Sequence, residues 1–448
     1  MIERGLFKHI RTSIEETALT ILTGPRHAGK SSLLRQLMHR LASEAGVRAD
    51  RILYFDFDDV LGRIEMDAES RSLRKAIEQK TGQPIESLDA PIYLFFDEIQ
   101  AMPRFLPVLS DLLKLNRSRI KMVVASSVSI PKKELAQTGL KDDIRVLYLP
   151  FLSSTELINE RVLPLGDESA LAAILRGKLS TSYFNDLQAL VKNSRSEIER
   201  IFSEQLVFGG MPAVFDEDDP SRRWQLLQHS LRDYFEKEFH SMAQIADLRK
   251  YNQILKILSA HNGEIYNILN ICDDFGLNRN TVRKYVGMMQ ETYVLDFVPP
   301  HLEDDVKKVV MRTPKLFFQN NGWVNYWGNY RDLETLRQTS HLQSALDAVL
   351  FQNLNYHVRL TSESIQIRFL KDYQNHSLDF LIWRESSLIP VGICHDAEAQ
   401  KIKIHNFRYF LKYCSQISQG VLFGKFDTID VKEIRGSTLF LLPLWLLW

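Results

Sequence analysis

The stretch that constrains this chain most is a short apolar run followed by a glycine-rich loop. Residues 18–23 are apolar or β-branched and predict a buried strand. Residues 24–31, Gly-Pro-Arg-His-Ala-Gly-Lys-Ser, match the pattern G-x-x-x-x-G-K-[ST]. Residues 32–41 then repeat leucine and methionine at helical spacing. Because the order of strand, loop and helix is the one that a phosphate-binding loop requires, this stretch predicts a nucleotide site better than an ordinary turn with two glycines.

The residue types of this loop suit the binding of a phosphate group. Gly24 and Gly29 permit backbone angles that a Cβ atom would obstruct. The loop amides and the following helix N-terminus supply donors, and Lys30 adds a positive charge for the β- and γ-phosphates. The Ser31 hydroxyl can ligate the Mg²⁺ that accompanies ATP. The predicted nucleotide-binding residues are Gly24, Pro25, Arg26, His27, Ala28, Gly29, Lys30, Ser31 and Ser32.

A second apolar run ends in two acids. Residues 91–96 form a continuous apolar stretch that predicts a strand buried on both faces, and Asp97 and Glu98 follow it. We expect Asp97 to hold Mg²⁺ together with Ser31, and Glu98 to activate the water that attacks the γ-phosphate. An acidic strand end is common by itself, but together with the upstream loop it indicates a nucleotide site.

Residues 51–59 predict another strand that ends in acids, namely Asp56, Asp58 and Asp59. At the carboxyl end of a strand in an α/β sheet, such acids lie on the edge that binds ligands. They either help to position the nucleotide metal or cap the next helix. We favour the cap.

Two more strands are predicted at residues 120–127 and 144–150. The first ends in hydroxyls, and Ser127 either senses the γ-phosphate or caps a turn. The second carries Arg145 near its start. Arg145 either reaches the γ-phosphate in a neighbouring subunit, where such an arginine accelerates hydrolysis by roughly 10³–10⁵, or is a surface arginine. The pattern alone leaves both pairs of alternatives open.

Composition limits the remaining possibilities. A chain of 448 residues suggests about three domains of roughly 150 residues. The 56 basic and 56 acidic side chains balance, so any nucleic-acid surface must be local. Three cysteines without metal or disulfide spacing suit a reducing compartment. Residues 438–448 are apolar but too short to cross a bilayer as a helix, and predict a buried strand broken by Pro443. We therefore expect a cytoplasmic protein without a membrane partner.

Several motifs along the chain resemble those of prokaryotic AAA-type ATPases that carry a C-terminal domain of unknown function. The Phe-Asp-Glu-Ile-Gln and Gly-Gly-Met-Pro combination is more specific than the nucleotide motifs. The resemblance spans nearly the whole chain. The motifs are Gly-Pro-Arg-x-x-Gly-Lys-Ser (24–31), Tyr-Phe-Asp-Phe-Asp-Asp (54–59), Phe-Asp-Glu-Ile-Gln (96–100), Leu-Pro-Phe-Leu-Ser (149–153), Phe-Gly-Gly-Met-Pro (208–212), Thr-Val-Arg-Lys-Tyr (281–285), Pro-Lys-Leu-Phe-Phe (314–318) and Leu-Asp-Phe (378–380).

The resemblance implies an α/β fold with a P-loop NTPase parallel sheet as its core. It implies four parts: an ATP-binding core at 1–152, a helical lid and connector at 153–246, a winged helix at 247–300 and a restriction-nuclease-like α/β domain at 301–448. It also strengthens the catalytic interpretation of Arg145.

In one place the chain departs from the pattern of this family. The family usually has Thr-Gly-Ser at the end of the third apolar strand, and this chain has Ala-Ser-Ser at 125–127. The departure leaves the identity of the sensing residue open, with Ser127 as the better candidate. The Gly-Gly-Met-Pro segment at 209–212 predicts a turn between helices, and its residues suggest no catalytic role.

The predicted winged helix offers a candidate nucleic-acid surface. Residues 264–272 and 279–290 predict two helices around a turn, and residues 293–298 predict a β-rich wing. The second helix presents Arg279, Arg283 and Lys284, together with Asn280, at accessible positions. The alternative is a protein–protein module, and the neutral composition does not decide between the two.

The last domain lacks most of a nuclease site. A restriction-type nuclease needs an Asp on one strand and Glu-x-Lys on the next to hold Mg²⁺ and activate water. Asp379 is present, but Gly392 and Cys394 stand where the Glu and the Lys belong, and residues 341–354 contain no Glu. We therefore expect this domain to keep the fold without nuclease activity.

Together these observations predict an ATP-binding protein that hydrolyses ATP. Lys30 and the loop amides bind the phosphates, Ser31 and Asp97 hold Mg²⁺, and Glu98 activates water. We expect hydrolysis to change what the winged helix and the last domain contact. The alternatives are a nucleotide-regulated switch or scaffold with little turnover and a DNA-associated motor. A homo-oligomer and an unidentified protein partner are compatible with either.

Overall fold

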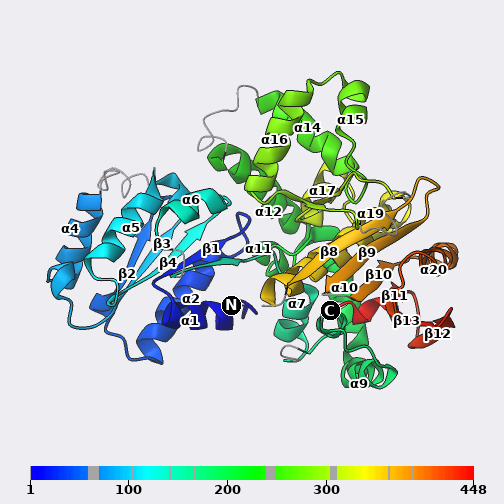
Figure 1. The fold of residues 1–448 in the computed structure, drawn as a ribbon, viewed down its shortest axis with the longest axis horizontal. Coiled ribbons are helices and arrows are strands. Elements are labelled where there is room, and N and C mark those ends of the chain that lie inside the picture. Colours follow the sequence, from blue (N-terminus) through cyan, green and yellow to red (C-terminus); the bar gives the residue numbers. More distant parts are fainter. Residues whose placement is uncertain are drawn as a thin grey trace.

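The computed structural model describes residues 2–58, 70–102, 104–140, 143–164, 168–238, 248–302, 310–361, 364–384 and 387–448. The described residues form two bodies (Figure 1). The first third of the chain builds a sheet with flanking helices, and the rest builds a larger second body. Among the described residues, no helix has the length and apolar character needed to cross a membrane.

The first body is a five-stranded parallel sheet in the order β2-β3-β4-β1-β5. Its strands are β1 (Leu19–Thr23), β2 (Ile52–Asp56), β3 (Ile92–Asp97), β4 (Ile120–Ser126) and β5 (Ile144–Tyr148). Its helices are α1 (Phe7–Glu16), α2 (Lys30–Ser43), α4 (Ser70–Thr81), α5 (Phe105–Leu115) and α6 (Lys132–Gln137). The predicted parallel α/β core is confirmed, although Asp59 lies outside the described residues.

Apolar side chains cover both faces of this sheet. Leu33, Leu34 and Leu37 of α2 pack with α1 on one face, as the helical spacing predicts. Leu73 of α4 and Leu109 of α5 contribute to the separate cluster on the other face. A continuous apolar strand such as β3 forms here because helices exclude water from both of its faces.

The second body contains a six-stranded mixed sheet in the order β12-β13-β11-β10-β9-β8. Its strands are β8 (Ile365–Lys371), β9 (Ser377–Arg384), β10 (Ser387–Ile393), β11 (Gln419–Gly424), β12 (Asp430–Ile434) and β13 (Ser437–Pro443). Helix α20 (Ala397–Phe410) connects β10 to β11, which pair in parallel. The predicted terminal strand is β13, and it ends at Pro443.

The helices that follow the first body belong to the second one. They are α7 (Ser154–Arg161), α8 (Ala170–Arg176), α9 (Thr181–Val191), α10 (Arg195–Phe208), α11 (Pro212–Phe215), α12 (Pro220–Asp233) and a π-helix at Tyr234–Glu238. Helices α17 (Asn321–Gly328), α18 (Leu333–Arg337) and α19 (His341–Leu360) precede the sheet.

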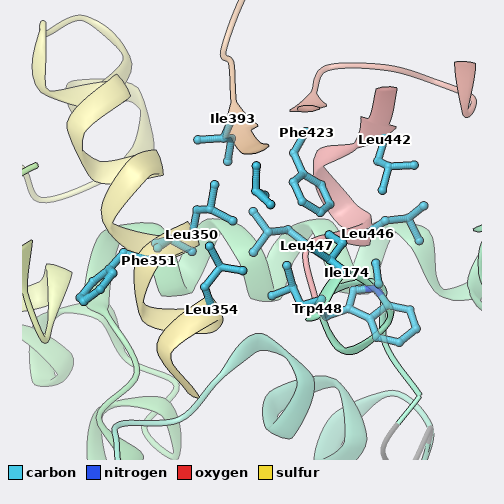
Figure 2. Close-up of a cluster of buried hydrophobic side chains, with 14 of the residues drawn as sticks. Ile174, Leu350, Phe351, Leu354, Ile393, Phe423, Leu442, Leu446, Leu447 and Trp448 are labelled. Carbon is cyan, nitrogen blue, oxygen red and sulfur yellow. The ribbon is translucent and has the colours of Figure 1, made fainter. Parts of the chain in front are cut away.

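A single apolar core joins α7–α10 to the six-stranded sheet. Figure 2 shows Ile174 of α8 beside Leu350 and Leu354 of α19 and the terminal residues Leu446–Trp448. The Leu171 amide donates to the terminal Trp448 carbonyl over 3.1 Å. The segment interpreted as a lid on the ATP-binding core is therefore packed against the C-terminal sheet.

Helices α14 (Leu248–Ala260), α15 (Ile268–Phe275) and α16 (Arg279–Glu291) lie beside a small antiparallel pair, β6 (Leu295–Val298) and β7 (Lys315–Phe318). Ile265 forms an isolated bridge with Lys315, which is why α15 begins later than the predicted helix. The boundary predicted at residue 300 falls between two paired strands. The winged-helix interpretation stays a prediction.

Candidate nucleotide-binding site

The phosphate loop connects β1 to α2 at the carboxyl edge of the parallel sheet. Gly29 has φ of 95° immediately before the first residue of α2, a conformation that side chains disfavour. A Cβ atom on Gly24 would lie 2.2 Å from the Leu149 carbonyl oxygen. Both glycines are therefore required by the backbone, one for its angle and the other for a close approach.

The Lys30 ammonium lies within the loop itself. Nζ donates to the carbonyl oxygens of Gly24 and Pro25, each over 2.9 Å, and the side chain is buried. These carbonyls hold the ammonium in the loop, and its charge also lowers the pKa of Glu98. From this position the ammonium can meet a phosphate that enters the loop.

Asp97, at the end of β3, meets the start of α2. Its carboxylate accepts a hydrogen bond from the Tyr54 hydroxyl on β2 over 2.8 Å and faces the Ser31 hydroxyl, which partly offsets the effect of burial on its pKa. Burial raises the pKa of Asp97, and burial together with the Asp97 charge raises the pKa of Tyr54. Hydroxyl and carboxylate oxygens are the donors that Mg²⁺ prefers, so Ser31 and Asp97 fit this ion.

Glu98 is held by three neighbouring side chains. Ser127 Oγ donates to both carboxylate oxygens, over 3.1 and 3.0 Å, and Gln100 Nε2 donates to Oε2. The Arg26 guanidinium lies 3.4 Å from the same oxygen. Burial alone would raise the pKa of Glu98, but the charges of Lys30 and Arg26 outweigh it and lower the pKa. Glu98 is thus an ionised carboxylate in a positively charged setting.

The acids at the end of β2 differ in their surroundings. The Asp56 carboxylate accepts from the Asp58 amide over 2.9 Å, which closes a local turn. The Asp58 carboxylate instead faces Arg26 at 4.0 Å. Arg26 therefore lies between acids from two neighbouring strands, a role for this residue that the sequence pattern did not indicate.

The hydroxyls of Ser126 and Ser127, at the end of β4, make different contacts. Ser126 Oγ donates to the Val128 carbonyl in a local turn, whereas Ser127 faces Glu98. Arg145 lies elsewhere, at the exposed edge strand β5 opposite Thr20, and its guanidinium is 3.0 Å from the Glu16 carboxylate. The structure does not bring Arg145 to the phosphate loop of its own chain, so its predicted role concerns a neighbouring subunit.

Sequence reasoning missed Arg4, which is buried beneath the loop. Its guanidinium donates to the carbonyls of Ala28 and Pro150, each over 2.6 Å, and to Glu156 over 2.8 Å. A single arginine in a charged N-terminal segment carries no local signal for such a role. Tyr54 and Gln100 were also missed, although both lie inside motifs that the resemblance quoted.

The phosphate loop also touches the second body. His27 Nε2 lies 3.5 Å from the Asp233 carboxylate at the end of α12, and burial is the main cause of its lowered pKa. The Leu152 amide donates to the Gly210 carbonyl over 2.7 Å. A Cβ atom on Gly29 would lie 3.7 Å from Pro212. The Gly-Gly-Met-Pro segment therefore lies against the phosphate loop, and is more than a turn between helices.

The residues around Asp379, where a restriction-type nuclease would hold its metal, are arranged differently from our expectation. Asp347 of α19 supplies a buried carboxylate near Asp379. The Oδ1 atom of Asp347 accepts a hydrogen bond from Gln343 over 2.9 Å. The first 14 residues of this helix contain no Glu. Burial raises the pKa of Asp347 to about 6. Lys403 Nζ lies 2.5 Å from the Asp379 carboxylate. The expectation of a lone carboxylate was therefore wrong, because the second acid comes from a helix.

Two lysines, Lys403 and Lys315, lie near these two acids. Lys315 is buried beside Asp379 and Asp347, and burial is the main cause of its lowered pKa. A Cβ atom on Gly392 would lie 2.8 Å from the Asp379 carboxylate, so a glutamate at that position would displace the present arrangement. In the part of the chain that the structure describes, no group of three or more His, Cys, Asp or Glu side chains is placed to hold a metal ion.

The candidate nucleic-acid residues remain together on one helix. Arg279, Asn280, Arg283 and Lys284 are exposed on α16. The Asn278 side chain caps the helix by accepting from the amides of Asn280 and Thr281. The structure keeps these side chains accessible, and DNA binding stays a prediction.

Comparison with known families agrees with this geometry. Residues 16–158 match the family model described as an AAA domain, and residues 199–334 match a domain of unknown function. The chain carries an AAA-type P-loop domain. No curated protein matches the chain.

Two solved structures are similar to parts of the chain. C. elegans PCH-2 is 16% identical over 34% of this chain, with a TM-score of 0.24, and the match spans only 41% of PCH-2. A DNA polymerase III gamma subunit-related protein from Thermotoga maritima is 13% identical over 64% of this chain and 99% of its own, with a TM-score of 0.26. At these scores neither likeness adds to the assignment, which depends on the family match and on the observed sheet.

Proposed function

We propose that the AAA domain binds Mg-ATP and hydrolyses it. The observation that carries the proposal is that Ser31 of the phosphate loop faces Asp97 of β3, with Glu98 next in the chain. Ser31 and Asp97 are 66 positions apart in the sequence, and both lie at one edge of the sheet, where a bound nucleotide with Mg²⁺ would need them.

In this proposal, Lys30 and the loop amides bind the phosphates, while Ser31 and Asp97 would hold Mg²⁺. When bound, Mg²⁺ neutralises charge on the phosphates. Glu98 orients and deprotonates the attacking water. One of its oxygens must first be released, and the 3.4 Å contact with Arg26 is its longest. The γ-phosphate is an anion that competes for Arg26, so ATP would remove this contact and leave Glu98 held by Ser127 and Gln100.

We further propose that the nucleotide state reaches the second body through the phosphate loop. Ala28 shares an apolar cluster with Phe151, Met211 and residues of α14–α16, and His27 faces Asp233. A change in loop conformation would alter these contacts first. Because α7–α10 share a core with the C-terminal sheet, we expect that whole body to move as one unit.

The test is steady-state phosphate release from the full chain with Mg-ATP. We expect Lys30→Ala to abolish ATP binding, and Glu98→Gln to keep binding while turnover falls at least about 100-fold. Glu134→Gln, an exposed change on α6, is the matched control and should leave turnover unchanged. Normal turnover in Glu98→Gln would remove Glu98 from this role.

The second candidate is a nucleotide-regulated switch with little turnover. It is favoured by one observation: both Glu98 oxygens already accept hydrogen bonds. Stoichiometric ATP binding without turnover above the Lys30→Ala blank would support the switch over the ATPase.

A further inference from the structure

A cavity of about 340 Å³ lies in the second body, away from the phosphate loop. It opens outside the carboxyl ends of β10, β11 and β13, three strands that pair in parallel. Helices α10 and α19 form its walls. Figure 2 shows Ile393, Phe423 and Leu442, near the ends of these strands, in the buried apolar cluster. In open α/β sheets this edge is where ligands bind.

The cavity has an apolar interior. Phe202 of α10, Leu346 of α19 and Trp445 after β13 are among its lining residues. Trp445 is buried, and its Nε1–H has no hydrogen-bond partner among the described residues. A volume in this range and a largely apolar lining suit a small organic molecule.

The charges at the rim leave a positive excess. Arg195 is 2.8 Å from Glu199 and 3.3 Å from Asp427, so both acids of the lining are already paired with it. Arg337 and Lys425 also line the cavity with exposed side chains. Lys425 lies near enough to Asp396, which is outside the lining, to lower its pKa. The lining itself therefore carries three cations, Arg195, Arg337 and Lys425, against two acids.

We propose that this cavity binds a small amphipathic anion, with an apolar, ring-sized body inside and one carboxylate, sulfonate or phosphate at the Arg337 and Lys425 rim. The proposal does not depend on ATP hydrolysis. Helix α10 forms one wall of the cavity, and its last residue, Phe208, leads directly into the Gly-Gly-Met-Pro segment beside the phosphate loop.

The test uses anilinonaphthalenesulfonate as a fluorescent amphipathic anion with the full chain. We expect one saturable equivalent, displaced by naphthylacetate and not by the naphthylmethylammonium cation of the same ring. Charge reversal by Arg337→Glu with Lys425→Glu should weaken binding at least about tenfold. Lys401→Glu, an exposed change on α20, is the matched control and should have no effect.

Ser203→Trp fills the cavity from the half-buried face of α10 and should abolish binding, while an unchanged thermal unfolding curve would show that the variant folds. The charge-reversal pair, on exposed side chains, tests the site independently. Equal competition by anion and cation, several equivalents per chain, or undiminished binding in folded Ser203→Trp would each overturn the proposal.

Discussion

The two sheets of this protein both bring acids to a functional position, but they treat these acids in opposite ways. In the parallel sheet, Asp97 accepts from the Tyr54 hydroxyl and faces the Ser31 hydroxyl. In the mixed sheet, Lys403 is bonded directly to Asp379. The acid expected to hold the metal at the first site therefore has hydroxyl partners, whereas the acid at the second site is paired with a cation.

This difference shows that the presence of acids and lysines does not by itself allow a site to bind a metal or a ligand. Around Asp379 lie two buried acids, the buried Lys315 and the half-buried Lys403, and each charge already has a neighbour of opposite sign. The expected absence of nuclease activity stays a prediction, and its reason is now internal neutralisation. We expect no cleavage of duplex DNA with Mg²⁺. Cleavage that disappears in Asp379→Ala would contradict this.

The largest effect should be a loss of stability when Lys403, the cation paired with Asp379, is replaced. Lys403→Met leaves Asp379 and Asp347 buried with one cationic partner fewer, so the free energy of unfolding should fall by about 3–5 kcal/mol. Denaturant unfolding of the full chain, followed through the transition of the second body, measures it. Lys401→Met, which removes an exposed lysine from the same helix, should change stability by less than about 0.5 kcal/mol. Equal effects would mean that the Lys403 pair does not stabilise the fold.

The next effect concerns the site that is open to a ligand. Asp97→Asn should weaken ATP binding about ten- to hundredfold when Mg²⁺ is present, because it removes a charged oxygen donor. The same variant should bind ATP normally in the presence of a chelator. Asp379→Asn is the comparison from the second sheet and should leave both affinities unchanged. A loss that is the same with and without Mg²⁺ would argue against the metal role of Asp97.

A smaller effect should appear as a pH dependence in the second body. The pKa of Asp347 is raised to about 6. The folded state therefore holds a proton that the unfolded state has lost, and the stability gained this way decreases as pH rises from about 4 to 6. Asp347→Asn should remove this slope and stabilise the protein by about 1–3 kcal/mol above pH 6. Unfolding curves at several pH values measure this slope, and the exposed change Asp218→Asn is the control. A slope that persists in Asp347→Asn belongs to another group.

The smallest effect is expected at α16. If its basic residues bind duplex DNA, affinity should fall with salt, and Arg283→Ala should reduce the slope of log affinity against log salt by roughly 0.9. Lys401→Ala, outside this helix, should leave the slope as it is. Binding that does not respond to salt would favour a protein partner for this surface.

The parallel core was predicted from local sequence patterns and is confirmed, and the same patterns predict the main residues of the nucleotide site. A phosphate loop is encoded in eight consecutive residues, and the acids of β3 follow their strand directly. Strands buried on both faces are recognisable because every position is apolar. Such local patterns can be recognised without knowing which distant parts of the chain they contact.

The pairing of groups that are distant in the sequence depends on how the fold packs. Arg4 meets Glu156 across 152 positions, and Arg26 meets Glu98 because the order of the strands brings β3 near the phosphate loop. Lys403 reaches Asp379 from a helix, where no strand motif would place a lysine. The attachment of α7–α10 to the C-terminal sheet likewise depends on which apolar faces meet. Periodicity shows that a face is apolar, but packing chooses its partner.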